Sequence, residues 1–72
     1  MMDTMRDVQI KDSMIRLGQF LKLADVVGAG SDVKSLLAAG QVRVNAEPET
    51  RRGRQLVRGD EVSVGGETYR VV

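Results

Sequence analysis

The chain of 72 residues contains neither cysteine nor histidine. A domain of this size buries only about 60% of the surface that its unfolded chain exposes, and small domains often add disulfide bonds for stability. The lack of cysteine excludes such bonds and fits a reducing cytoplasm. Without cysteine or histidine, a zinc site would need carboxylates alone, which structural zinc sites rarely use. We therefore expect no metal and no other cofactor.

Aromatic residues are scarce, since the chain has one phenylalanine, one tyrosine and no tryptophan. Proteins that bind single-stranded nucleic acid stack the bases on exposed aromatic side chains. Phe20 belongs to an apolar helical stripe and Tyr69 to an expected strand, so the two cannot form such a platform. This composition disfavours single-strand binding and leaves open the recognition of folded, helical RNA by its shape and its phosphates.

Long apolar runs are missing too, and no stretch approaches the roughly 18 residues that cross a membrane. The first residues, "MMDTMRD", are polar and partly acidic, unlike a signal peptide. We expect a cytoplasmic protein with no membrane partner.

Groups suited to catalysis are few as well. The sequence has no cysteine or histidine that could act as a nucleophile or base, and neither a G-x-S-x-G nor a P-loop pattern. Glu47 and Glu49 are two carboxylates in a polar loop, where such groups are commonly solvated. We predict that the protein is not an enzyme and has no small-molecule substrate.

Apolar spacing predicts a first helix in "SMIRLGQFLKLADVV", beginning between Ser13 and Leu17. Its apolar residues recur at i, i+3, i+4 and i+7, the spacing of one helix face: Leu17, Phe20, Leu21 and Ala24. Polar residues share a different face: Arg16, Gln19 and Lys22.

A second, short helix is predicted after "GAGS", residues 28–31. Ser31 is a good N-cap residue, Asp32 is favourable at the positive end of a helix, and Gly40 is a natural residue to follow the last turn. The apolar spacing continues within it at Val33, Leu36 and Leu37. A helix this short is unstable alone, so we expect its apolar side to dock on the first helix.

The C-terminal part alternates with a period of two, which predicts strands. Three such strands are expected, around Val42–Val44, Val62–Val64 and Tyr69–Val71. Gly65 and Gly66 lie between the last two strands and are a signal for a two-residue hairpin turn.

The N-terminal part is less regular. Residues 1–7 show no apolar periodicity and are expected to form a flexible terminus, whereas Val8–Ile10 suits a short strand. We therefore predict a single domain over residues 8–72. Its class is α+β, with a short N-terminal strand, two packed helices and then a small, mainly antiparallel sheet of three further strands.

Basic residues gather in "ETRRGRQLVR", residues 49–58, although the 11 basic and 10 acidic residues of the chain leave a net charge of only +1. Self-repulsion makes such a cluster unfavourable unless it meets an anionic surface, and the planar guanidinium of arginine suits bidentate contact with phosphate. Basic residues of other segments could converge with this loop, which gives the set Arg16, Lys22, Lys34, Arg43, Arg51, Arg52 and Arg54. The set favours an anionic partner and matches the phosphate contacts of nucleic-acid-binding proteins.

Two other functions remain open from the residues alone. A protein-interaction module would use strand edges or Val26 and Val27, with the arginines meeting an acidic protein. A small duplex-DNA-binding protein would place the second helix in the major groove, but that helix offers few side chains to base edges.

Several motifs occur in a characteristic order between residues 15 and 62. They are "RLGQFLKLA", a loop of small residues with serine before a basic second helix, "G-x-V-x-V-N", and a "GD" turn before an apolar strand. In this order they resemble the RNA-binding domain named after small-subunit ribosomal protein four, the S-four domain. The resemblance covers roughly two-thirds of the chain, and "ETRRGR" is most similar to the small free-standing bacterial members.

The resemblance implies a helix pair followed by a sheet (the αL RNA-binding motif) that binds structured RNA, either ribosomal or transfer RNA, and associates with the ribosome. Carried over by position, it implies RNA-binding roles for Arg16, Ser31, Lys34, Arg43, Asn45, Arg51, Arg52 and Arg54. Together with Lys22 from the charge pattern, these are the candidate RNA-binding residues.

Two positions depart from the family pattern. Position 18 is glycine where many relatives have aspartate, so a capping or orienting role of that side chain is absent. Position 46 is alanine where the family usually has glycine after asparagine, so we expect the turn at Asn45 to be built differently or to be strained.

Overall fold

The computed structural model of the chain describes residues 4–28 and 30–72. This part contains two helices and seven strands, so the predicted α+β class is confirmed. The elements before residue 40 are β1 (Thr4–Val8), β2 (Met14–Arg16), α1 (Leu17–Leu23) and α2 (Gly30–Ala38). Those that follow are β3 (Val42–Val44), β4 (Glu47–Pro48), β5 (Gln55–Val57), β6 (Glu61–Val64) and β7 (Glu67–Val71).

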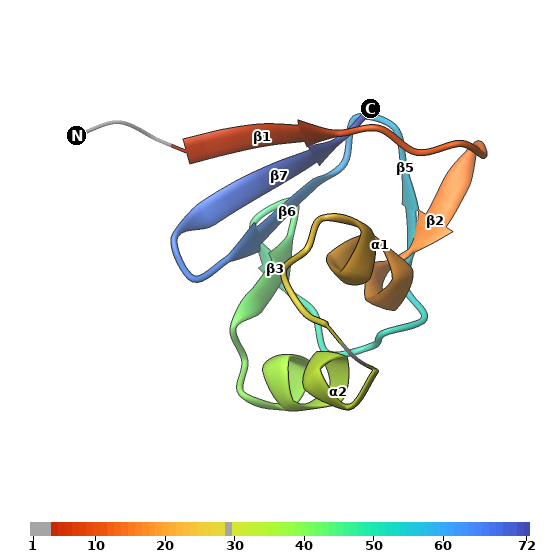
Figure 1. Cartoon of the computed structure of the whole chain (residues 1–72). Coiled ribbons are helices and arrows are strands. Elements are labelled where there is room, and N and C mark those ends of the chain that lie inside the picture. Colours follow the sequence, from red (N-terminus) through yellow and green to blue (C-terminus); the bar gives the residue numbers. More distant parts are fainter. Residues whose placement is uncertain (1–3, 29) are drawn as a thin grey trace.

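The strands form two separate sheets. A five-stranded sheet has the order β1-β7-β6-β3-β4, and β2 pairs with β5 in a sheet of two strands. β1 runs parallel to β7, and the other strand pairs in the described chain are antiparallel, as predicted. Figure 1 shows α1 between the two sheets, with α2 beside α1 on the side away from β1 and β7.

The core lies where α1 meets both sheets. Leu17, Phe20 and Leu21 of α1 are completely buried, as their spacing predicted. Val33 and Leu37 of α2 are buried as well, and the sheets contribute Val42, Val44, Leu56, Val62, Tyr69 and Val71. Burial of each large apolar side chain contributes about 1.5–3 kcal/mol, and this packing holds the short helices in place.

The N-terminal strand differs from its prediction. The strand is Thr4–Val8 rather than Val8–Ile10, so residues 4–7, expected to belong to a flexible terminus, lie in β1. β1 is held by its parallel register with β7, from Thr4 opposite Glu67 to Val8 opposite Val71. "TMRDV" shows no apolar alternation because an edge strand is held largely by backbone hydrogen bonds, which side-chain patterns do not reveal.

Three short strands were missed. β2 and β5 pair over three residues each, and β4 pairs with β3 over two, so five strands rather than three follow the helices. β4 has only two residues, and "MIR" in β2 and "QLV" in β5 do not alternate between apolar and polar residues as "VRV" in β3 does, so no period of two identifies them. α1 begins at Leu17, within the predicted range, but ends at Leu23 because Asp25 takes a positive φ of 61°.

The turns follow the glycine pattern in one hairpin and depart from it in another. Gly65 and Gly66, with φ of 56° and 92°, join β6 to β7 in the predicted two-residue turn. The turn from β3 to β4 has the same length, but its positive φ values of 52° and 72° belong to Asn45 and Ala46. Alanine is strained there, because its Cβ crowds the backbone when φ is positive.

Candidate functional site

A groove runs beside the N-terminal half of α1. It has a volume of about 320 Å³ and lies between the two helices and the loop of residues 49–54, called here the arginine loop. Its lining residues are Arg16, Gly18, Gln19, Lys22, Val33, Arg52 and Gly53. Three of the candidate basic side chains therefore surround one hollow, and they come from β2, α1 and the arginine loop.

Gly18 allows the arginine loop to lie close to α1. A Cβ added at Gly18 would lie 3.4 Å from Cβ of Arg52 and 3.5 Å from Cγ1 of Val33. The N–H of Leu17 donates to the carbonyl of Arg54 at 2.8 Å, and that of Gly18 to the carbonyl of Arg52 at 2.9 Å. The first free amides of α1 are thus satisfied by the backbone of the loop, in place of a capping side chain.

A second hollow adjoins the first across Arg52. It has a volume of about 280 Å³ and is lined by Lys34, Leu37, Ala38, Thr50 and Arg52. Because Arg52 lines both hollows, it links the basic residues of α1 to Lys34 of α2.

Four candidate residues therefore form one surface, called here the basic surface: Arg16, Lys22, Lys34 and Arg52. All four are exposed, and within residues 4–28 and 30–72 none of them forms an ion pair. Arg16 donates from Nη1 to the carbonyl of Gly53 at 3.3 Å, which ties its guanidinium to the loop. Cations without acidic partners leave a net positive potential that attracts phosphate.

The arginines on either side of Arg52 in the sequence bind Glu49 instead. Arg51 donates from Nε to Oε2 at 3.1 Å and from Nη2 to Oε1 at 3.3 Å, and Arg54 donates from Nη1 to Oε1 at 3.0 Å. Glu49 is only 7% exposed, so the expectation that its carboxylate is solvated was wrong, whereas Glu47 is exposed. The hydrogen bonds from Arg51 and then from Arg54 lower the pKa of Glu49 from 4.5 to about 2.

The remaining candidates lie elsewhere or outside the described part. Arg43 is exposed on β3, and Asn45 lies in the β3–β4 turn; neither lines the two hollows of the basic surface. The side chain of Asn45 donates to Asp60 Oδ1 at 3.2 Å and accepts the N–H of Glu61 at 3.0 Å, so it serves the fold. The side chain of Ser31 lies outside the described residues. α2 begins at Gly30, which places Ser31 in its first turn rather than at the expected N-cap.

Sequence reasoning missed part of this site. Gln19 and Gly53 line the groove, and Thr50 lines the second hollow. Gln19 shares the polar helix face of Arg16 and Lys22, so spacing could have included it. Gly53 and Thr50 lie in an irregular loop, where no periodicity indicates which side chain faces which way.

In the part of the chain that the structure describes, no three histidine, cysteine, aspartate or glutamate residues come together in a group that could hold a metal ion. Neither helix of this part is long and apolar enough to span a membrane.

Comparison with known proteins gives consistent matches. A family model described as "S4 domain" matches residues 8–72. The "Probable ribosome maturation protein RlbA" of Bacillus subtilis is 51% identical over 59 residues, which cover 82% of this chain and 83% of that protein. The "Putative RNA-binding protein YbcJ" of Escherichia coli is 36% identical over 62 residues, which cover 86% of this chain and 89% of that protein.

A solved structure is similar as well. The 30S ribosomal protein S4e of Thermoplasma acidophilum superposes with a TM-score of 0.65 and 27% identity. The match covers 86% of this chain but 33% of S4e, so the chain corresponds to about a third of that ribosomal protein. The helix pair, the sheet and the family model agree with the resemblance seen in the sequence: the chain belongs to the S4 domain family.

Proposed function

We propose that the protein is a non-catalytic RNA-binding protein that docks on structured RNA, with ribosomal RNA as its partner and the cytoplasm as its location. The observation that carries the proposal is the basic surface, where four exposed cations from β2, the two helices and the arginine loop line adjoining hollows and form no ion pair in the described chain. Phosphate oxygens are the ligands that such a surface fits.

The geometry favours folded RNA over other nucleic acids. A pair of helices with a basic loop beside it can contact the phosphates of a folded RNA by shape, as proteins that bind double-helical RNA do. Phe20 and Tyr69 are both buried, so neither offers a stacking platform to single strands. α2 has nine residues, and the exposed polar side chains that the structure describes in it are Asp32, Lys34 and Ser35, which equips it poorly to read the bases of DNA.

The names of the relatives support a ribosomal partner. One relative is named as a ribosome maturation protein, another as an RNA-binding protein, and the structural neighbour is a protein of the 30S subunit. Transfer RNA is the alternative partner, because it is also a folded RNA that presents phosphates to the basic surface. A protein-interaction module would use strand edges or Val26 and Val27, and the half-burial of these two valines against the core disfavours them as a docking patch.

The test measures affinity for a folded ribosomal RNA fragment, a transfer RNA and a DNA duplex of similar length over a series of salt concentrations. We expect ribosomal RNA to bind most tightly, with log K falling linearly with log salt because phosphate contacts release counterions. Replacing all four residues of the basic surface by alanine should reduce the salt slope by about 1 for each lost contact.

Arg6→Ala is the matched control, because Arg6 is an exposed arginine of β1 outside the basic surface. Its affinity should equal that of the wild type within about twofold, since exposed ion pairs contribute little. Equal affinity for RNA and DNA would contradict the proposed partner. A fourfold alanine variant that binds like the wild type would contradict the proposed surface.

A further inference from the structure

The arginine loop is organised around one buried carboxylate. The carboxylate of Glu49 binds the guanidinium groups of Arg51 and Arg54, and its Oε2 also accepts the backbone N–H groups of Thr50 at 3.1 Å and Arg51 at 2.9 Å. The backbone N–H of Glu49 donates to the carbonyl of Val42 at 3.0 Å, which fixes the residue to β3. Glu49 therefore binds several hydrogen-bond donors of the loop through its carboxylate and attaches the loop to the five-stranded sheet through its backbone.

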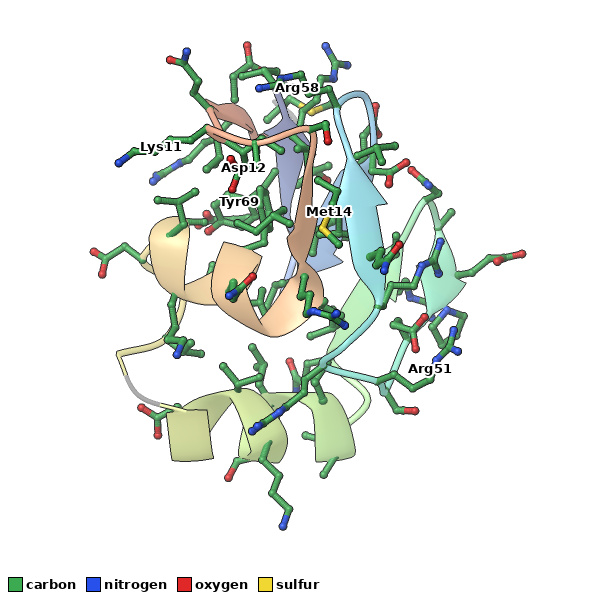
Figure 2. All side chains as sticks on the ribbon, turned by 90° about the vertical axis from the view of Figure 1, so that its right-hand side faces the viewer. Lys11, Asp12, Met14, Arg51, Arg58 and Tyr69 are labelled. Carbon is green, nitrogen blue, oxygen red and sulfur yellow. The ribbon has the colours of Figure 1, made fainter. Side chains whose placement is uncertain are left out.

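The two sides of this loop carry different groups. Glu49 holds Arg51 and Arg54 on one side, and Figure 2 shows Arg51 on the side of the loop that faces away from α1. The carbonyls of Arg52 and Arg54 face the other way and accept the first amides of α1. The side chain of Arg52 lies on this second side, where it lines both hollows.

We propose that Glu49 is a positioning residue for RNA binding: its carboxylate clamps Arg51 and Arg54 and so fixes the loop in the shape that presents Arg52 on the basic surface. This inference rests on the proposed function. The clamp acts through Arg52, since Glu49 is buried and has no access to a ligand. Without the clamp, a loop of this length could adopt many other conformations. Because the clamp fixes the loop in one conformation before RNA binds, the loss of conformational entropy on binding is smaller.

The sign of the effect separates this role from simple electrostatics. Glu49 is an anion beside a surface that attracts phosphate, so Coulomb's law alone predicts that its neutralisation strengthens RNA binding. The clamp predicts the opposite, because the loop and Arg52 lose their fixed position.

The experiment compares Glu49→Gln with Glu47→Gln against the folded ribosomal RNA fragment at one salt concentration. Both variants remove one negative charge from the same segment, but Glu47 is exposed on β4 and forms no hydrogen bond or ion pair with the arginine loop in the described chain. We expect Glu49→Gln to bind about tenfold more weakly, the loss typical of a charge-assisted network. Glu47→Gln should bind as well as the wild type or slightly more tightly.

A second readout follows the loop itself. The amide protons of Leu17 and Gly18 are bonded to the carbonyls of Arg54 and Arg52, so their hydrogen exchange reports the position of the loop. In Glu49→Gln we expect their exchange to be about tenfold faster, with unchanged protection in the β6–β7 hairpin. Unchanged exchange at both amides would overturn the clamp, as would RNA binding that equals or exceeds that of the wild type.

Arg51→Lys decides the matter if Glu49→Gln does not fold. The side chain of Arg51 is 75% exposed, so the fold should tolerate lysine, which keeps the positive charge but loses the two-pronged contact with Glu49. We expect about threefold weaker binding, and unchanged affinity would overturn the clamp. A wild-type protein that does not bind the RNA refutes the proposed function. If the wild type binds the RNA and Arg52→Ala weakens this binding, but Glu49→Gln does not, the proposed function stands and only the clamp is refuted.

Discussion

Arg51 and Arg52 are neighbours in the sequence, but their side chains have different contacts in the folded structure. Arg51 contacts Glu49 through two nitrogens, at 3.1 and 3.3 Å, whereas Arg52 lines two hollows and has no ion-pair partner among the residues that the structure describes. Arg54 shares the carboxylate, and Arg58 donates from Nη2 to the carbonyl of Ile10 at 3.0 Å. Of this arginine cluster, most members serve the fold and Arg52 faces outward.

This difference explains how a nearly neutral chain tolerates the cluster. The repulsion among the arginines is relieved from inside by Glu49, which takes up two of them. The cluster is therefore weaker evidence for a phosphate ligand than its composition indicates. That evidence lies in Arg52, whose side chain lines both hollows of the basic surface.

The largest expected effect comes from replacing each neighbour by alanine. Arg52→Ala should weaken binding of the ribosomal RNA fragment by about 1.5–3 kcal/mol, at least tenfold, because a hydrogen bond to a charged group is lost. Arg51→Ala should weaken it less, because its guanidinium already has a partner. Filter binding or fluorescence anisotropy measures both. Equal losses would break the distinction between the two arginines.

A smaller effect should appear in the dependence of stability on pH. The folded pKa of Glu49, about 2, lies below its ordinary value of 4.5, so its contribution to the free energy of unfolding is complete above pH 4.5 and is lost as pH falls towards 2. Arg51→Ala removes the largest cause of the lowered pKa and should make this loss shallower. Arg52→Ala should keep the wild-type slope. Urea unfolding between pH 2 and 6 tests this, and identical slopes in all three proteins would contradict it.

The smallest effect concerns stability alone and serves as a control for both arginines. Ala46→Gly relieves the positive φ of 72° in the β3–β4 turn and should raise the free energy of unfolding by about 1 kcal/mol. For a domain of this size that corresponds to a rise in Tm of about 4–8 °C, measured by thermal unfolding. RNA affinity should not change. A change in affinity would mean that stability influences binding and would weaken conclusions drawn from the arginine variants.

The helices and the core could be predicted because their signals are periodic. Leu17, Phe20 and Leu21 identify the buried face of α1. Arg16 and Lys22 share a different, polar face, and both side chains line the groove. The pairing of β1 with β7 could not be predicted, because it depends on backbone contacts between distant segments.

The arginine loop marks the limit of prediction for the site. In an irregular loop no period decides which side a residue faces, so Arg51 and Arg52 looked equivalent in the sequence. The burial of Glu49 depends on the docking of the loop against α1 and β3, which no local pattern reveals. Arg51 and Arg52 differ in their hydrogen bonds in the folded structure, and the composition of the loop does not indicate this difference.

The parallel pairing of β1 with β7 also constrains the order of folding. Contacts between residues so far apart in sequence close a long loop, which costs entropy and slows folding relative to local pairs such as the β6–β7 hairpin. During translation, which proceeds from the N-terminus, β1 is made early but has no partner until Glu67–Val71 has emerged. We therefore expect the helix pair and the hairpins to form first, with β1 joining the sheet in the last step.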